Sequence, residues 1–301
     1  METLEQLRHQ LEAMEDLASI VRTMKALAAV NIRQYEMAER SLTQFDRAVE
    51  LGLHVILREL PPPRITAPRA ERVGAIVFGS DHGMCGRFNE EVVGHAAEWF
   101  ANAAGGKRPH VIAVGARVAA LLEARGLQAE RDMFVPGSAA RIGATVRQIL
   151  LALEEWQVGG RAERVYLFHN RSSAAGRYRP TRTRLLPVNL HRLHGLEGEK
   201  WPSRSLPTYT MRRDLLFARL LRQSFFVTLF RACAESLAAE NSARLVAMQS
   251  AERNLDDRQQ ELLGQFRRLR QDAITAELLD VVSGYEALRR GDPIAGARRM
   301  T

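Results

Sequence analysis

Apolar side chains recur every three or four residues at both ends of the chain, a spacing that predicts amphipathic helices. The N-terminal segment has no proline and a single glycine up to residue 60, which predicts one helix over 1–60. No proline lies between Pro207 and Pro293, which predicts a second long helix over 206–290. The first stripe contains Leu4, Leu7, Leu11, Met14, Ala18 and Val21, and the second runs from Leu216 through Leu245, Leu255 and Phe266 to Ala273.

Two helices of this length have no place in a small globular core, where helices average ~11–12 residues. An amphipathic helix gains most of its stability from packing, so each long stripe needs another long helix as its partner. We therefore expect an antiparallel coiled coil closed by the two ends of the chain. In that pairing, Leu4, Leu7 and Leu11 pack against the helix near Phe266, Leu269 and Ala273.

The middle of the chain has a different pattern, with short apolar runs that alternate with helical segments. Three successive prolines end the first helix and predict a linker over 61–72. The alternation over 73–205 predicts an inserted Rossmann-like α/β domain with a mostly parallel sheet. Strands are expected at 73–78, 110–114, 164–169 and 181–187, and helices at 89–103, 117–125 and 140–156. Residues 291–301 form a C-terminal extension.

Composition narrows the class of protein. The formal net charge of +8 fits an acidic protein partner, a nucleic acid or an anionic surface, but no zinc spacing or RNA-binding aromatic signature accompanies it. Cys85 and Cys233 are the two cysteines, which argues against a disulfide framework or a cysteine metal site and fits a reducing cytoplasm. We expect no signal peptide, no transmembrane segment, no metal and no cofactor.

Four segments of the chain carry a family signature. They are IVRTMKALAA at 20–29, GSDHGMCGRFN at 79–89, ENSARLVAM at 240–248 and RQDAITAEL at 270–278. In this order they resemble segments of the γ subunit of F-type ATP synthases. The resemblance implies a central rotor that has no catalytic site of its own and couples ion-driven rotation of a membrane ring to ATP synthesis or hydrolysis at β subunits. It also implies the partners: the ring of α and β subunits, the ε subunit and the membrane c-ring, with the rotor peripheral on the cytoplasmic side of the membrane.

The same resemblance assigns contacts with the β subunit. The residues of this chain that match those contacts are Arg270, Gln271, Thr275, Met24, Lys25 and Arg244. The arginine fork suits a carboxylate, because a guanidinium offers five donors in a fixed plane. Without the motif, Arg270 and Gln271 would be interpreted as a solvated helix flank, and Thr275 as a cap or a packing residue.

The segment after the first strand of the α/β domain has three interpretations. Cys85 beside His82 suggests a nucleophile, yet neighbours on one turn rarely align for proton transfer. A glycine-rich turn before a helix also suggests a phosphate loop, but neither a following Lys-Ser/Thr pair nor a G-x-G-x-x-G pattern is present. The resemblance instead predicts a structural turn, in which Asn89 caps the next helix. The residues of that turn are Asp81, Gly83, Cys85, Gly86 and Asn89.

Departures from the family pattern leave some alternatives open. Glu252-Arg253-Asn254 stands where the family has TDN, and Arg87 follows Cys85-Gly86 where the family has a second glycine. These departures resemble the alternative, sodium-translocating bacterial branch, but ion choice is made in the membrane ring, so H⁺ or Na⁺ coupling stays open. A coiled-coil scaffold or basic nucleic-acid-binding adaptor would show salt-dependent DNA affinity. A small α/β hydrolase or nucleotide-binding enzyme with helical arms would hydrolyse substrate alone.

Overall fold

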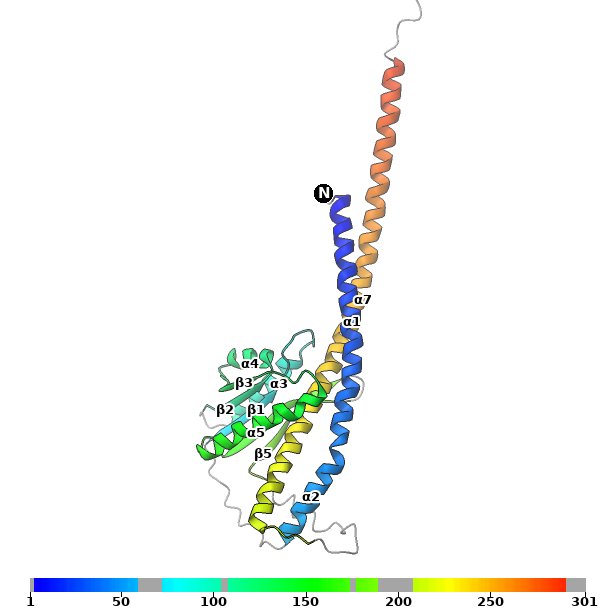
Figure 1. Cartoon of the computed structure of the whole chain (residues 1–301). Helices are drawn as coiled ribbons and strands as arrows, with labels where there is room; N and C mark the ends of the chain where they lie inside the picture. Colours follow the sequence, from blue (N-terminus) through cyan, green and yellow to red (C-terminus); the bar gives the residue numbers. More distant parts are fainter. Residues whose placement is uncertain (1–2, 59–71, 104–107, 174–176, 189–207, 291–301) are drawn as a thin grey trace, which may run out of the picture. The chain divides into compact units, whose positions relative to one another are not determined.

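The computed structural model describes residues 3–58, 72–103, 108–173, 177–188 and 208–290, and forms two compact units. We call residues 1–24 with 249–301 the terminal unit, and residues 25–248 the head unit. Helices α1 (Leu4–Ser41) and α7 (Arg213–Arg290) each contribute to both units (Figure 1). The predicted linker, except for Arg72, and the predicted extension lie outside the described residues.

The terminal unit is a pair of antiparallel helices. The first turns of α1 lie beside α7, with Leu7 and Ala18 buried on α1 and Leu262 buried on α7 (Figure 1). The predicted partners Leu4, Leu11, Phe266 and Leu269 are half-buried.

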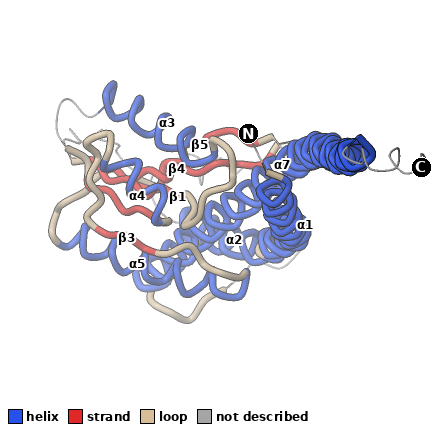
Figure 2. Tube along the Cα trace, turned by 90° about the horizontal axis from the view of Figure 1, so that it is seen from above, coloured by secondary structure: helices blue, strands red, loops and turns tan. Residues whose placement is uncertain are grey.

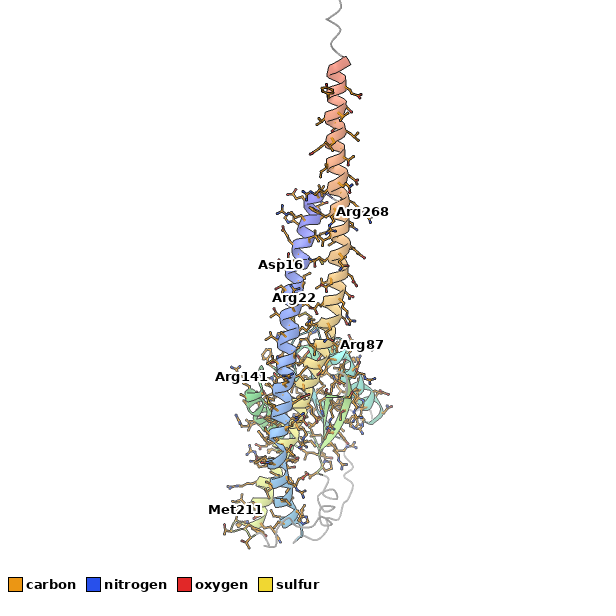
Figure 3. All side chains as sticks on the ribbon, turned by 90° about the vertical axis from the view of Figure 1, so that its right-hand side faces the viewer. Asp16, Arg22, Arg87, Arg141, Met211 and Arg268 are labelled. Carbon is orange, nitrogen blue, oxygen red and sulfur yellow. The ribbon has the colours of Figure 1, made fainter. Side chains whose placement is uncertain are left out.

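The predicted packing of Ala273 is wrong, because this residue is exposed. Figure 3 labels Arg268 on α7 next to the first turns of α1. Since α1 begins at Leu4, α7 passes the end of its partner soon after Arg268 and continues without it.

The predicted single helix over 1–60 is divided at Leu42 into α1 and α2 (Thr43–Arg58). The Leu42 amide donates to the Glu39 carbonyl at 3.2 Å, an i−3 bond in place of the regular i−4 bond. The Ser41 hydroxyl donates to the Ala38 carbonyl at 2.8 Å. Ser and Thr side chains compete with the helix for backbone partners, which explains a break that the apolar spacing does not reveal.

The head unit contains a five-stranded sheet in the order β3-β2-β1-β4-β5. Its strands are β1 (Val73–Phe78), β2 (His110–Val114), β3 (Arg131–Met133), β4 (Arg164–Ser172) and β5 (Tyr178–Leu186). The first four pair in parallel, and β5 pairs antiparallel with β4. The predicted fold class, long terminal helices around a mostly parallel α/β domain, is confirmed. The short edge strand β3 was not predicted, since its sequence Arg-Asp-Met carries no apolar run.

Helices cover both faces of this sheet (Figure 2), and an apolar layer lies on each face. Alternate residues of β1 point to opposite faces. Ile76 and Phe78 pack towards α5 (Ile142–Val158) and α7. Ala75 and Val77 pack towards α3 (Phe88–Ala103) and α4 (Ala116–Glu123). A single turn, η1 (Ala139–Arg141), precedes α5. The first face therefore joins the α/β domain to the long C-terminal helix.

Small side chains dominate the part of α7 that covers the sheet. Its buried residues there include Ala232, Ala234, Ala238 and Ala239, with Leu229, Cys233 and Leu237 beside them. On α1, Tyr35 joins the same core, and the Asn31 amide donates to the Asn241 side-chain oxygen at 3.4 Å. The shaft helices and the sheet thus share one hydrophobic core within the head unit.

Candidate functional site

The end of α7 is an apolar helix surface without a partner in the described chain. All residues from 271 to 286 are exposed, and among them the large apolar side chains are between 48% and 70% exposed. They are Ile274, Leu278, Leu279, Val281, Val282 and Tyr285. A contiguous exposed apolar surface is typical of a protein–protein contact. We call these six residues the apolar tip.

Polar residues from the predicted contact set lie at the base of the apolar tip. Arg270 and Gln271 are exposed, and within the described residues Arg270 makes no ion pair. The Thr275 hydroxyl donates to the Gln271 carbonyl at 2.8 Å, which uses the hydroxyl inside the helix but leaves the Gln271 side chain free to bind outward. The arrangement offers a guanidinium and a carboxamide to an incoming chain.

The other predicted contact residues lie elsewhere along the helices. Met24 and Lys25 are half-buried on α1. Arg244 on α7 donates to the Glu240 carboxylate at 2.6 Å, with the two side chains only 13% and 8% exposed. Burial raises the pKa of the Glu240 carboxyl, and the Arg244 guanidinium opposes that shift. Arg244 therefore binds a partner within its own helix, whereas the guanidinium of Arg270 is exposed and can bind another chain.

The turn after β1 is tied together by its own polar side chains. The Asp81 carboxylate accepts hydrogen bonds from the backbone amides of Ala116 at 2.9 Å and Val135 at 3.0 Å. The Asn89 side chain accepts from the Ser80 amide at 2.9 Å and donates to the Ser80 hydroxyl at 2.8 Å. Asn89 lies inside the first turn of α3 and reaches back to the loop, so the expectation that it caps the helix is wrong. The turn joins β1 to the starts of α3 and α4.

The glycines of this turn have different surroundings. A Cβ added at Gly83 or Gly86 would have no atom within 4 Å, although Gly86 has φ +60. Gly79, at the end of β1, is different, since a Cβ there would lie 2.5 Å from Val118. Close packing of β1 against α4 thus requires glycine at the start of the turn.

The thiol of Cys85 is poorly suited to nucleophilic chemistry. It is buried in a cluster with Phe88, Ala239, Ala243 and Tyr178, and burial raises the pKa of the thiol. His82, its hypothetical base, is exposed and approaches it only through a backbone carbonyl, 3.9 Å from the sulfur. A thiol held in its protonated form reacts slowly, so the cluster is best explained by packing. Burial likewise raises the pKa of Cys233 to about 12.

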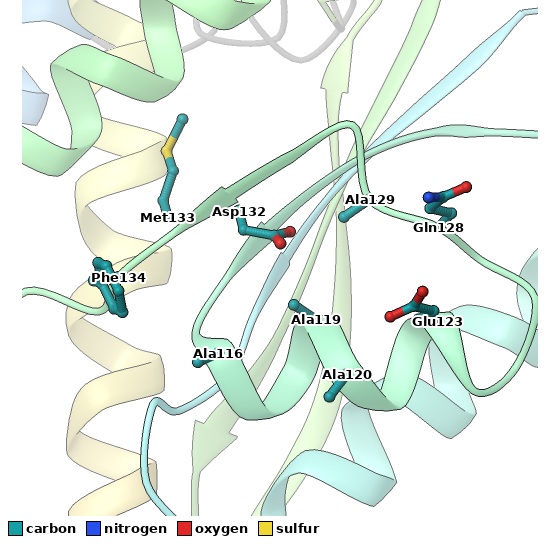
Figure 4. A pocket seen from close by; sticks show the side chains of 9 residues that line it. All are labelled: Ala116, Ala119, Ala120, Glu123, Gln128, Ala129, Asp132, Met133 and Phe134. Carbon is teal, nitrogen blue, oxygen red and sulfur yellow. The ribbon is translucent and has the colours of Figure 1, made fainter.

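A pocket of about 490 Å³ lies between α4 and the edge strand β3 (Figure 4). Alanines of α4 form one wall, and Met133 and Phe134 form the other. Its charged side chains are the carboxylates of Glu123 and Asp132. Because carboxylates repel phosphate groups, this pocket does not suit a nucleotide.

Metal-binding clusters and membrane-spanning helices also bear on the class of protein. Across the described residues, no cluster of three or more His, Cys, Asp or Glu side chains could hold a metal ion. Among the helices of that same part of the chain, none combines the length and apolar character that crossing a bilayer requires.

Sequence reasoning missed two features of this site. The sequence analysis assigned the apolar tip to the coiled coil. The apolar stripe of the C-terminal helix is longer than that of the N-terminal helix, so its end extends beyond the paired region. The contact of His169 and Arg171 on β4 with Glu235 on α7 was not foreseen. The alternation Leu167, His169, Arg171 within an apolar strand was its only signal, because it continues a buried face with two polar groups, of which His169 is buried.

Comparison with known proteins identifies the family. The family model described as ATP synthase matches residues 3–288, which is nearly the whole chain, so the chain belongs to the ATP synthase family. Its curated relatives are gamma chains, and within the family this chain is of that non-catalytic type. The ATP synthase gamma chain of Syntrophus aciditrophicus (strain SB) is 28% identical over 298 residues, covering 97% of this chain and 100% of the relative. That of Anaeromyxobacter sp. (strain Fw109-5) is 27% identical over 297 residues, covering 96% and 100%.

Solved structures share the fold. A chain of the Euglena gracilis mitochondrial ATP synthase, in an OSCP/F1/c-ring structure in rotational state 3, matches with a TM-score of 0.69 and 17% identity, covering 99% of this chain and 98% of that chain. A chain from the central stalk/c-ring structure of the Tetrahymena thermophila mitochondrial ATP synthase matches with a TM-score of 0.55 and 17% identity, covering 77% and 99%. Long terminal helices with an inserted α/β domain are therefore the architecture of this family.

Proposed function

We infer that the chain is the central rotor subunit of an F-type ATP synthase, which couples rotation of a membrane ring to ATP synthesis or hydrolysis at β subunits. The family match over residues 3–288 supports this function. The structural observation that carries it is the apolar tip, a helix end that protrudes past its own partner helix and needs an external surface to cover it.

The partners follow from the same role. The ring of α and β subunits surrounds the apolar tip, and the α/β domain carries the ε subunit and rests on the c-ring. One similar chain comes from a structure that contains F1 and a c-ring, and another comes from a central stalk/c-ring structure, which supports this set of partners. The chain is a peripheral part of the F1 sector, and we place it on the cytoplasmic side of the membrane. It requires no cofactor of its own.

The contacts with the β subunit are proposed from the residues that match the family's motifs. Arg270 and Gln271 bind a loop of β through the open guanidinium and carboxamide, and Thr275 lies one turn further on the same helix. Met24 and Lys25 on α1, and Arg244 on α7, each contact an acidic segment of β. Because Arg244 already binds Glu240, its contact is shared between the two subunits.

Reconstitution with α and β subunits tests this function. The isolated chain should show no ATP hydrolysis, and the assembled complex should show it. Arg270→Ala and Gln271→Ala should assemble normally, because surface polar groups on a helix affect stability by only ~0.5 kcal/mol. Both variants should lower turnover, because each loses a contact with the β subunit. Arg253→Ala, an exposed arginine whose guanidinium donates to the Gln249 carbonyl of its own helix, is the matched control and should retain turnover.

Two results would contradict the proposal. Robust hydrolysis by the purified chain without α and β would show that it is an enzyme. Normal turnover of both the Arg270 and Gln271 variants would show that β binds elsewhere on the chain.

A further inference from the structure

Three side chains connect the sheet of the head unit to α7 through charge. The His169 ring nitrogen Nε2 lies 2.7 Å from Glu235 Oε2, and Arg171 Nε lies 3.2 Å from Glu235 Oε1. Both carboxylate oxygens of Glu235 are therefore bound by residues of one strand, β4. We call His169, Arg171 and Glu235 the clamp.

The clamp lies in a buried part of the interface. The side chains of His169 and Glu235 are only 4% and 9% exposed, whereas Arg171 is half-exposed. Nε2 of His169 faces the carboxylate of Glu235 within hydrogen-bond distance. Among the described residues, Nδ1 of His169 is buried without a partner. The orientation of the imidazole is thus set by Glu235.

Other charged groups surround the clamp from each element that packs there. Arg231 on α7 binds Asp46 on α2 at 2.6 Å. The pKa of the Glu39 carboxyl on α1 is raised, mainly by burial. The nearby carboxylate of Glu235 is the second cause of this rise. The clamp is therefore the centre of a polar region shared by α1, α2, α7 and β4.

The rest of the contact between α7 and the sheet is mostly apolar. The buried surface of α7 there is rich in alanine, and apolar contact depends on area, with no preference for direction. Leu229 and Leu237 add larger side chains to that face, and they too contribute by the apolar area that they bury. Hydrogen bonds, by contrast, weaken steeply when distance or angle changes. The clamp supplies a directional contact between α7 and the sheet.

We propose that the clamp is a positioning device that locks α7 to the sheet and transmits torque between the α/β domain and the shaft. This proposal rests on the rotor function above, in which the α/β domain meets the membrane ring and α7 meets the β subunits. Torque that enters at the α/β domain must reach α7 through the interface between them. His169, Arg171 and Glu235 hold that interface in register while the load acts.

Single-molecule rotation of the complex of α, β and this chain tests the proposal. Val158, which is 92% exposed on α5, is replaced by cysteine so that a bead can be attached to the α/β domain. In Glu235→Gln, ATP hydrolysis in bulk should stay near the wild-type rate, because the shaft still turns inside the ring. The angular spread of the bead at each pause should widen by roughly twofold or more, and its torque should fall accordingly. Loss of stability alone would lower hydrolysis and torque together.

Further variants separate register from folding. Arg171→Gln removes the half-exposed arm of the clamp and should widen the spread without loss of assembly. Arg222→Ala, which breaks an exposed pair between α7 and Glu154 of α5, is the matched control and should leave the spread unchanged.

The outcomes distinguish the two proposals. A bead on the wild-type complex that does not rotate during hydrolysis overturns the rotor function. Rotation of the wild type, together with wild-type spread and torque in both Glu235→Gln and Arg171→Gln, overturns the clamp alone.

Discussion

The carboxylate of Asp81 accepts a hydrogen bond from the backbone amide of Val135, 54 residues further along the chain, at 3.0 Å. Its other oxygen accepts from the amide of Ala116 at the start of α4. One side chain after β1 therefore holds the beginning of α4 and the segment after β3. This relationship makes Asp81 a stabilising residue of the α/β domain.

Asp81→Ala should lower the free energy of unfolding by roughly 1–3 kcal/mol, because two backbone donors lose a charged acceptor. Urea denaturation of the purified chain measures the change. Asp132→Ala is the control, since Asp132 is exposed on β3 and should shift stability by no more than ~0.5 kcal/mol. Equal stabilities of the two variants would show that the Asp81 bonds contribute nothing net.

Gly115→Ala should destabilise the head unit by at least about 1–3 kcal/mol. Gly115 has φ +125, and a Cβ there would lie 2.8 Å from the backbone of Ser80. Gly137→Ala provides the comparison, because nothing lies within 4 Å of its Cβ position. Thermal unfolding should show a clear fall in Tm for the first variant and almost none for the second. Similar Tm values would mean that the turn relaxes without cost.

Arg244→Ala should destabilise the chain in a pH-dependent way. Burial already raises the pKa of Glu240 above its ordinary value of 4.5, and Arg244 opposes this shift, so its loss raises that pKa further. The folded state then binds a proton that the unfolded state has released, and stability falls as pH rises between the two pKa values. The loss should reach roughly 3–5 kcal/mol near neutral pH, the usual cost of breaking a buried pair.

Urea denaturation at about pH 5 and about pH 8 measures this difference. The gap between wild type and Arg244→Ala should be smaller at the acidic value, where Glu240 more readily takes up a proton. A gap of the same size at both values would show that Glu240 does not titrate in this range.

Leu7→Ala should loosen the terminal unit. Leu7 is completely buried there, and removing a buried leucine side chain to Cβ costs roughly 2–5 kcal/mol. Hydrogen exchange should show faster exchange across the first turns of α1, with little change in the sheet of the head unit. Leu17→Ala is the matched control in the same helix, since Leu17 is 45% exposed. Unchanged exchange in the Leu7 variant would contradict the helix pairing.

Local spacing made most of the fold predictable. The period of three and four residues predicted α1 and α7, and short apolar runs followed by a glycine predicted β1 and β2, because both signals depend on neighbours in sequence. The features that sequence missed depend on tertiary context. The break at Leu42 interrupts a continuous stripe, and β3 is a strand only because β2 offers it hydrogen bonds.

The site was predictable to a smaller extent. Family motifs pointed to Arg270 and Gln271, and the structure leaves both exposed. The motifs could not show that Arg244 binds Glu240, nor that Asn89 turns back to Ser80, because those partners are chosen by packing. His169 and Glu235 are 66 residues apart, and nothing in the sequence pairs them before α7 docks on the sheet.

The cluster of Cys85, Phe88 and Tyr178 has a consequence for how this architecture is used. In open α/β sheets, ligands bind in the crevice at the carboxyl ends of the strands, where successive connections leave in opposite directions. Here that crevice lies between β1 and β4, and the chain fills it with its own groups. Phe88 is fully buried there, and Asn170 of β4 donates to the Phe88 carbonyl at 2.7 Å. A dinucleotide could enter the crevice only by displacing the Phe88 ring. A topology that often binds cofactors is therefore packed with side chains here and forms a rigid domain.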